Sequence, residues 1–587
     1  MNDTRSSSIQ KTRDASLRKI AWAGLILATL YVCYFSHLGA FGFIGPDEPR
    51  YAWIARDMAE TGDWVTPRLY GKPWFEKPVL YYWAAALSFK LFGVSEATAR
   101  LPSALSALLA TLALAWLALC LAGREVARWL LVLLPATIGV IGFSHAAAPD
   151  MPFSAMLTIA MVCAAVALEL VPIQIPNRLA ASLVDVNSPS LVADISSASA
   201  ALLPSGEPLL GQAFPEQRHS RRYLSLLLFG FFLGAAVLAK GPAAVILAGG
   251  AIFLGACFTR RWRDALRLFH PITVGAFLLT SLPWYILCAR RNPDFFPIFI
   301  VEHNFKRYLT PEFQHVQPFW YYIPITLVAL LPWVFWLAWF ALNQARTSAT
   351  PSERAQAVFL AAWGLFPLLF FSVSKSKLPG YILPAVPPLV FLISLAVARS
   401  QKSRHAYPRY AVALTGLLFP LSACWVLLSK TGLGGTLVSV YTFFAVLGGL
   451  VVICVALLRS TRAGLISAVI LMLFLLILAY VSVGKLEPQL SARTSAAQIS
   501  PARAGVTYSF KLQRAWQYQL NFYLHREILE WSPDIPGEAV VVTTEKHLAE
   551  LENSAEIIAV ISDCSPQAEI VDIRPLPRNV AGGGQRR

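Results

Sequence analysis

Long apolar segments recur along this chain of 587 residues, and each is long enough to cross a lipid bilayer. A helix needs about 20 mainly apolar residues to span the hydrocarbon core. Thirteen segments meet this condition, centred near residues 30, 111, 137, 161, 231, 250, 280, 330, 364, 389, 419, 447 and 474. Only 14% of the residues are charged, against about 25% in an average soluble protein. The sequence therefore predicts an α-helical polytopic membrane protein.

The positive charges predict the orientation of these spans. Basic residues precede the first span, and alternation places the other basic connections on the same side of the membrane, which the charge rule makes cytoplasmic. The net charge of +16 could suggest nucleic acid, but the basic residues are scattered through short loops, so we do not expect nucleic-acid binding. An odd number of spans then places the C-terminus outside.

Two domains are expected. Residues 1–484 form the transmembrane domain, with an external catalytic loop at 41–100 and a cytoplasmic insertion at 172–222. The insertion is rich in Ser, Ala and Pro and is typical of disorder, with a re-entrant piece as the alternative. Residues 485–587 are more polar and contain two strand-like runs, so we expect a small external α/β domain.

The loop after the first span begins with two adjacent acids, Asp47 and Glu48, each followed or preceded by a proline. Acids beside a membrane span are costly and indicate function by default. The alternative is a helix cap, with Asp47 capping a helix that starts near Tyr51. Asp150, at the outer end of the third span, has the same two interpretations. Paired carboxylates at one membrane face suit acid–base work, cation binding or stabilisation of a positive sugar ring.

Further charged groups fall on the same external side. The first loop carries many basic residues against the charge rule, which binding of an anionic ligand, most simply a phosphate, would explain. Its Glu76 and Lys77 stand among aromatic residues. Lys375 and Lys377 precede the tenth span, either as phosphate ligands or as side chains that reach for the membrane interface. Lys240, in a Lys-Gly-Pro turn, has the same two interpretations.

A histidine in the external loop after the seventh span, His303, is followed by Lys306 and Arg307. If Glu76 approaches His303, a divalent cation such as zinc is plausible, since both residue types ligate zinc. The spacing alone does not define a complete metal site. The chain has no Walker-type loop, dinucleotide fingerprint, zincin motif or GxSxG elbow, which argues against nucleotide-driven transport and soluble-cofactor redox chemistry.

Taken in order, the motifs GPDEPRY, KPWFEKPVLYYW, RLPS, DMP and KGP, then SKSKLPGY, resemble those of the GT-C glycosyltransferases that use polyprenyl-phosphate sugars. The resemblance covers about residues 20–400 and is strongest to bacterial lipid A aminoarabinose transferases, with the protein mannosyltransferases more distant. It implies a GT-C fold in the bacterial inner membrane, with the active site and the C-terminal domain in the periplasm.

The resemblance also implies roles for individual residues. These are active-site carboxylates at Asp47 and Asp150, lipid-phosphate contacts at Lys77, Arg307 and Tyr381, cavity-shaping residues at Arg50, Tyr51 and Tyr81, and a zinc-holding pair at Glu76 and His303.

The expected reaction moves a sugar from undecaprenyl phosphate to lipid A or another periplasmic acceptor, with inversion. Lys77, Arg307 and Lys375 suit the negative charge that builds on the leaving phosphate. A phosphate acceptor needs no base, whereas a hydroxyl acceptor would make Asp47 a general base. A protein or envelope-glycan glycosyltransferase with the same donor is the alternative, and a lipid flippase is a distant one. The expected partners are the donor, the acceptor and the bilayer, with the protein as a monomer.

Overall fold

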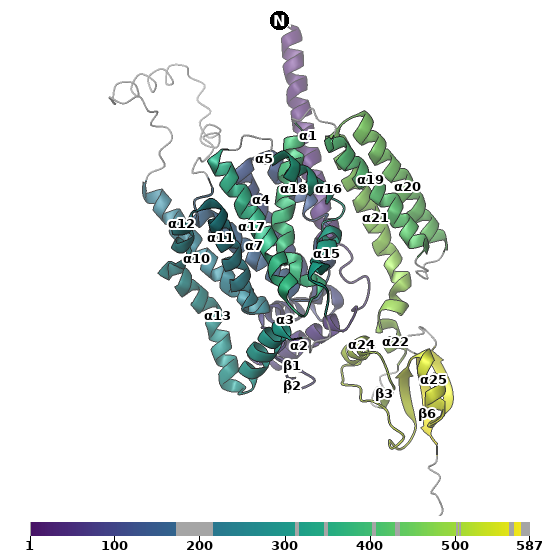
Figure 1. The fold of residues 1–587 in the computed structure, drawn as a ribbon. Helices are drawn as coiled ribbons and strands as arrows, with labels where there is room; N and C mark the ends of the chain where they lie inside the picture. The colour runs from purple at the N-terminus through teal and green to yellow at the C-terminus, as the bar shows by residue number, and fades with distance from the viewer. Residues whose placement is uncertain are drawn as a thin grey trace, which may run out of the picture.

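The computed structural model describes residues 2–171, 215–310, 316–344, 350–401, 407–428, 435–499, 503, 506–562 and 569–576. The described chain is a bundle of helices, with a small sheet domain beyond one end of it (Figure 1). The N-terminal end of the first helix projects from the opposite end of the bundle.

The helices of the bundle follow the predicted apolar segments. In chain order they are α1 (Asn2–Tyr34), α4 (Glu96–Ala122), α5 (Arg124–Leu133), α6 (Ile138–Ser144), α7 (Asp150–Ala167), α10 (Pro215–Lys240), α11 (Ala243–Thr259), α12 (Trp262–Leu266), η2 (Arg267–Phe269), α13 (Pro271–Arg291), η3 (Pro297–Lys306), α14 (Arg307–Leu309), η4 (Phe319–Tyr321), α15 (Tyr322–Ala329), α16 (Phe335–Gln344), α17 (Pro351–Val373), η5 (Pro379–Ala385), α18 (Val386–Ser400), α19 (Tyr407–Leu428), α20 (Gly435–Leu458) and α21 (Thr461–Leu490).

The predicted polytopic helical fold is confirmed, with a smaller number of full-length spans. In the described residues ten helices are long and apolar enough to cross a membrane, and the pair α5–α6, bent by 60°, makes an eleventh if it counts as one span. The two other predicted segments, near residues 250 and 330, are shorter apolar helices. Apolar composition marks a buried or membrane-embedded helix but does not ensure that the helix is straight or long enough to span.

The loop at 41–100 folds into α2 (Asp47–Thr61), a short hairpin and α3 (Leu80–Phe92). The strands of the hairpin, β1 (Arg68–Leu69) and β2 (Lys72–Pro73), have two residues each. These elements lie at the end of the bundle that faces the sheet domain (Figure 1). They form a separate apolar core with α13 and η3, around Trp284 and Phe295. The loop is therefore a folded layer that covers this end of the bundle.

The C-terminal domain has the predicted α/β composition. It contains α22 (Arg493–Gln498), β3 (Thr507–Ser509), α24 (Arg514–Leu524), β4 (Ala539–Thr543), α25 (Glu545–Glu552), β5 (Ala555–Ser562) and β6 (Glu569–Pro575). The strand order is β3-β4-β6-β5, with β3 parallel to β4 and the other pairs antiparallel. Helix α21 continues past the expected boundary at 484 into this domain.

The end of the insertion differs from the sequence-based expectation. Residues 215–222, assigned to the insertion, form the first turns of α10, while 172–214 lie outside the described residues. Helix α10 also packs closely on α13 at Gly230 and Gly234, where an added Cβ would meet Thr273 O at 2.2 Å and Thr280 Cβ at 2.8 Å. Small residues allow such close packing in membranes, and here they fix the position of Lys240 at the end of α10.

Candidate functional site

The two predicted carboxylates, Asp47 and Asp150, are the first residues of α2 and α7. Neither side chain caps its helix, because the N-cap residues are Pro46 and Pro149 and no side-chain cap bond forms. The expectation that α2 starts near Tyr51 is wrong. Proline is tolerated in the first helical turn, where its missing N–H would have no partner in the helix. Both carboxylates are therefore free of helix capping and available for other contacts.

Glu48 lies on the inner side of the first loop and is fully bonded. Its Oε1 and Oε2 accept from Arg100 Nε at 3.0 Å and Nη2 at 2.8 Å, and also from the backbone N–H groups of Ala147 and Ile44. Arg100 is completely buried and donates in addition to the carbonyls of residues 38, 41 and 42. This buried pair holds the loop to the bundle, so Glu48 has a supporting role.

Asp47 faces the other way, and its side chain is 59% exposed. Its Oδ1 lies 2.5 Å from Arg50 Nη2, and the same nitrogen lies 3.0 Å from Glu76 Oε2. Glu76 Oε1 in turn lies 3.4 Å from Lys77 Nζ. Burial disfavours the charged form of Arg50, but the carboxylates of Glu76 and Asp47 outweigh it and hold its pKa above the usual range. A line of alternating charges thus runs from Asp47 to Lys77.

A second carboxylate–cation pair lies at the junction of α7 and α10. Lys240 Nζ lies 2.5 Å from Asp150 Oδ1, and it also lies over the ring of Tyr381 at 4.9 Å. Gly380, just before that tyrosine, leaves room for the carboxylate, since a Cβ there would lie 2.9 Å from Asp150 Oδ1. The interpretation of Lys240 as a lysine reaching for the membrane interface is wrong, because the packing of α10 on α7 and α13 directs it into the protein.

The two charge groups meet at one pocket of about 360 Å³. Its walls combine polar groups from the first loop, from α10, from η3 and from the segment between α17 and η5 with apolar side chains. The lining residues are Glu76, Lys77, Lys240, Pro242, Ala243, Ile246, His303, Asn304, Tyr308, Leu309, Phe370, Phe371, Ser374, Ser376 and Tyr381. Such a pocket, apolar with a few convergent charges, suits an anionic group attached to a lipid.

Glu76 and His303 both line this pocket, as the expectation of a metal-holding pair requires. A carboxylate and an imidazole are suitable ligands for zinc. Within the described ranges no cluster of three or more metal-ligating side chains occurs. The chain thus offers two ligands here, and substrate or water would have to supply the others.

Other predicted residues lie beside the pocket. Lys377 donates to the carbonyls of Gln317 at 3.0 Å and Ser374 at 2.5 Å, and burial, with the nearby charge of Lys375, lowers its pKa. Lys375 is exposed. Lys377 therefore holds the shape of this segment, which contributes Ser374 and Ser376 to the pocket.

Tyr51, on α2, and Tyr81, on α3, are buried inside the folded loop. The hydroxyl of Tyr81 donates to Ala99 O. Burial raises the pKa of both phenols, so they are neutral packing groups. Arg307 begins α14, next to the pocket residue Tyr308, but its side chain lies outside the described part of the structure.

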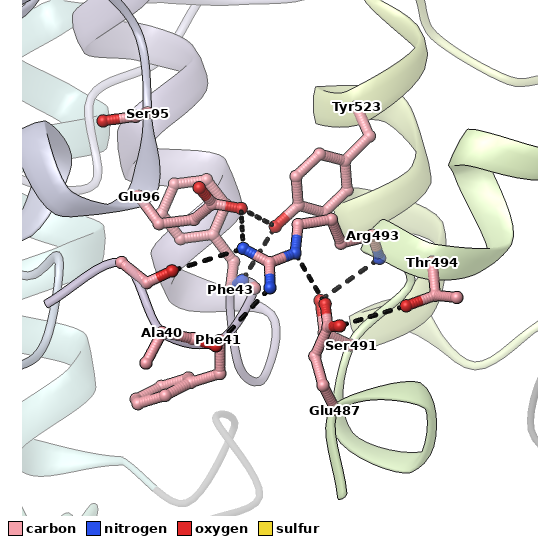
Figure 2. A network of polar contacts seen from close by, with 12 residues as sticks. Ala40, Phe41, Phe43, Ser95, Glu96, Glu487, Ser491, Arg493, Thr494 and Tyr523 are labelled. Atoms are coloured by element: carbon pink, nitrogen blue, oxygen red, sulfur yellow. Dashed lines mark hydrogen bonds and ion pairs between the residues drawn. The ribbon is translucent and has the colours of Figure 1, made fainter. Parts of the chain in front are cut away.

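The C-terminal domain is fastened to the first loop by a polar network (Figure 2). Glu96 accepts from Tyr523 Oη at 2.9 Å and lies 3.4 Å from Arg493, which also binds Glu487 at 2.7 Å. Tyr523 Oη further accepts from the N–H of Phe43 at 2.9 Å. This network places α24 along α2.

As a result the ring of Tyr518, on α24, lies 5.8 Å from the guanidinium of Arg50. Sequence reasoning missed this residue, gave Arg100 no role of its own, and left Lys240 with two interpretations. The RLPS and KGP motifs were available as signals for Arg100 and Lys240. Nothing local distinguishes Tyr518 from other tyrosines, because its contact depends on how two distant parts of the chain dock.

The fold matches that of a solved membrane protein. The structure superposes on ArnT from Cupriavidus metallidurans bound to undecaprenyl phosphate with a TM-score of 0.72, at 21% identity over 94% of this chain and 98% of that one. The apo form of the same protein gives 0.70 at 22% identity. The chain therefore has the GT-C fold of ArnT, as the sequence predicted.

Sequence comparison agrees with the fold. The family described as dolichyl-phosphate-mannose-protein mannosyltransferase matches residues 20–184 and 212–299. The undecaprenyl phosphate-alpha-4-amino-4-deoxy-L-arabinose arabinosyl transferase of Serratia proteamaculans is 29% identical over 64% of this chain and 59% of its own length. The protein of the same name from Erwinia tasmaniensis is 33% identical over 60% and 54%.

These alignments span less than two thirds of the relatives' length. Within that span the predicted resemblance is confirmed. The chain has the GT-C fold, and over these aligned ranges its sequence is similar to the aminoarabinose transferases and to the protein mannosyltransferase family.

Proposed function

We propose that this protein is a glycosyltransferase that takes a sugar from undecaprenyl phosphate and transfers it, with inversion, to lipid A or another acceptor at the periplasmic face. The observation that carries the proposal is the pocket in which Lys77, Lys240 and His303 converge at the end of apolar helices. Positive groups beside an apolar groove suit a phosphate on a polyprenyl chain. The names of the aligned relatives support the same donor.

In this mechanism the cationic side chains bind the lipid phosphate and stabilise the charge that builds as the sugar leaves. Asp150 keeps Lys240 directed into the pocket through their 2.5 Å contact. Glu76 and His303 could hold a divalent cation such as zinc, which would add positive charge beside the phosphate. Asp47, exposed at the far end of the charge line, is the group that faces an incoming acceptor.

The acceptor determines what Asp47 does. With a lipid A phosphate, Asp47 positions the nucleophile or stabilises positive charge on the sugar, and no proton has to be removed. With a hydroxyl acceptor, Asp47 takes the proton as a general base. A protein acceptor is the second candidate, favoured by the match to the protein mannosyltransferase family.

The test is an assay of purified full-length protein with an undecaprenyl-phosphate aminoarabinose donor and lipid A, read by mass spectrometry. We expect lipid A to gain the mass of the sugar, and Lys77→Met to lose this activity. Lys72→Met, an exposed lysine in the same loop, is the matched control and should keep it. Transfer to an unfolded Ser/Thr-rich protein instead of lipid A would favour the second candidate. No transfer to either acceptor from this donor or a hexose donor would overturn the proposal.

A further inference from the structure

A second pocket, of about 650 Å³, lies away from the candidate site. It is formed by the middle of α10, by the first and middle turns of α11, by the first two turns of α13, and by the short segment α12–η2 that joins α11 to α13. In Figure 1 this segment lies at the opposite end of the bundle from α2 and α3. The lining side chains are apolar except for Thr273. The proposed transfer reaction makes no use of this pocket.

The segment α12–η2 presents large apolar side chains that the protein leaves uncovered. Trp262, Leu266 and Phe269 are 42%, 66% and 76% exposed, and all three line the pocket. The ring of Phe253, on α11, lies 5.3 Å from that of Trp262 and fixes this wall in place. In a membrane protein such a surface is covered by lipid chains, and a defined concave wall favours one chain in one place.

The same segment carries positive charge next in sequence to the pocket-lining residues Trp262 and Leu266. Residues 260–267 include four arginines and one acid. Asp264 binds Arg261 at 2.6 Å and Arg267 at 2.9 Å, so one carboxylate is shared by two guanidinium groups. Arg260 and Arg263 are exposed, and the described part of the chain supplies no ion pair to either. Guanidinium groups beside an apolar slot suit a phosphate joined to an acyl chain.

We infer that this pocket binds a phospholipid with an anionic head group, with one acyl chain between α10, α11 and α13 and the phosphate at Arg260 and Arg263. The charge rule predicts that this end of the bundle faces the cytoplasm, where anionic lipids are recognised by such basic clusters. A polyprenyl phosphate has similar chemistry, but its phosphate has its own cationic pocket at the other end of the bundle. The bound lipid would fix the α11–α13 connection and, through it, the helices that carry Lys240 and His303.

The test is native mass spectrometry of the full-length protein with phosphatidylglycerol or phosphatidylcholine of identical acyl chains. We expect retention of phosphatidylglycerol several-fold above phosphatidylcholine, and loss of that preference in Arg260→Gln/Arg263→Gln. Arg290→Gln, an exposed arginine at the other end of α13, is the matched control and should keep it. An equal affinity for the two lipids, or an unchanged preference in the double variant, would overturn the inference.

A second variant tests whether the acyl chain binds in the pocket and leaves all charged residues unchanged. Gly249 lines the pocket, and a Cβ there meets nothing within 4 Å, so Gly249→Leu should fill the pocket and weaken binding of both lipids. Gly275→Leu, also at an open helical position but outside the pocket, should leave binding unchanged. Unchanged binding in Gly249→Leu would exclude this pocket. Displacement of phosphatidylglycerol by equimolar undecaprenyl phosphate would assign the pocket to the donor and overturn the inference as well.

Discussion

Asp47 and Glu48 are adjacent acids of the first loop, but their side chains lie in different environments. Glu48 is buried, and each of its oxygens accepts two hydrogen bonds from groups that fasten the loop to the bundle. Asp47 is mostly exposed and shares Arg50 with the pocket residue Glu76. Adjacent helical residues point about 100° apart, so one turn of α2 serves both the core and the site. The comparison separates a residue that holds the first loop in place from a residue that faces the candidate site.

The largest expected effect comes from breaking the buried pair. Glu48→Gln leaves Arg100 charged in a completely buried position, which costs about 3–5 kcal/mol of folding free energy. We expect low yield and early thermal unfolding in detergent, with loss of activity as a consequence. Glu60→Gln, which changes a carboxylate that is 59% exposed on the same helix, should lower the unfolding temperature less. Normal stability of Glu48→Gln would show that the pair is not what holds the loop.

The next prediction tests whether Asp47 takes part in the reaction, in contrast to Glu48, which supports the loop. Asp47→Asn should fold and unfold like the wild type but transfer sugar about 10²- to 10³-fold more slowly if Asp47 stabilises charge, and up to about 10⁴-fold more slowly if it takes the proton of a hydroxyl acceptor. The measurement is kcat with saturating donor, alongside the thermal unfolding curve. Near-normal kcat would remove Asp47 from the reaction, and a large loss of stability would place it with Glu48 as a structural residue.

Lys240 tests whether the second charge pair belongs to the donor pocket. Lys240→Met removes a charge-assisted contact worth about 1.5–3 kcal/mol, so we expect a roughly 10- to 100-fold rise in the KM for the donor. The KM for the acceptor should stay constant. Lys90→Met, an exposed lysine on α3, is the matched control. An effect on stability without a change in donor KM would make the Lys240–Asp150 pair structural.

A smaller effect is expected at the contact between the C-terminal domain and Arg50. A cation–π contact contributes about 0.5–2 kcal/mol, so Tyr518→Leu should reduce kcat/KM by a few-fold up to about 30-fold. Tyr518→Phe keeps the ring and should retain activity. Equal losses in the two variants would assign the role to the hydroxyl group instead of the ring.

The smallest effect is a pH dependence of the contact between His525, at the C-terminal end of α24, and Arg56 of α2. Burial, and then the charge of Arg56, lower the pKa of His525 below its usual value of 6.5. Its neutral form is thus favoured when folded, so the contact is at full strength above about pH 6.5 and weakens as pH falls towards the lowered pKa. His525→Asn, which tolerates the left-handed backbone at φ 58°, should flatten the fall in unfolding temperature between pH 7.5 and 5.5. An unchanged pH profile in this variant would exclude His525.

Much of the fold and part of the site could be predicted from local patterns. Each predicted apolar segment is a helix, although two are short and one is bent. The motifs around Asp47, Glu76 and His303 belong to elements that gather at one end of the bundle. Such predictions succeed because the length of an apolar run, and the side on which its loop emerges, are properties of a short stretch of sequence.

Other parts of the site depend on contacts between distant residues. Glu48 and Arg100 lie 52 positions apart, and Lys240 and Asp150 lie 90 apart. Lys377 looked like a free cation in sequence, yet it is turned towards two carbonyl groups. The sequence does not distinguish a solvated charged side chain from a buried one. The role of such a side chain therefore depends on its surroundings in the folded protein.

The sequence by itself determined that this chain is a membrane-embedded helical bundle whose reactive groups lie on one side, because hydrophobic length and charge bias act locally along the chain. Only the tertiary structure decided which of two neighbouring acids is buried, that Lys240 enters the pocket, and that Tyr518 reaches Arg50. Those outcomes follow from helix packing and domain docking, which bring together residues whose spacing in sequence carries no information about their distance.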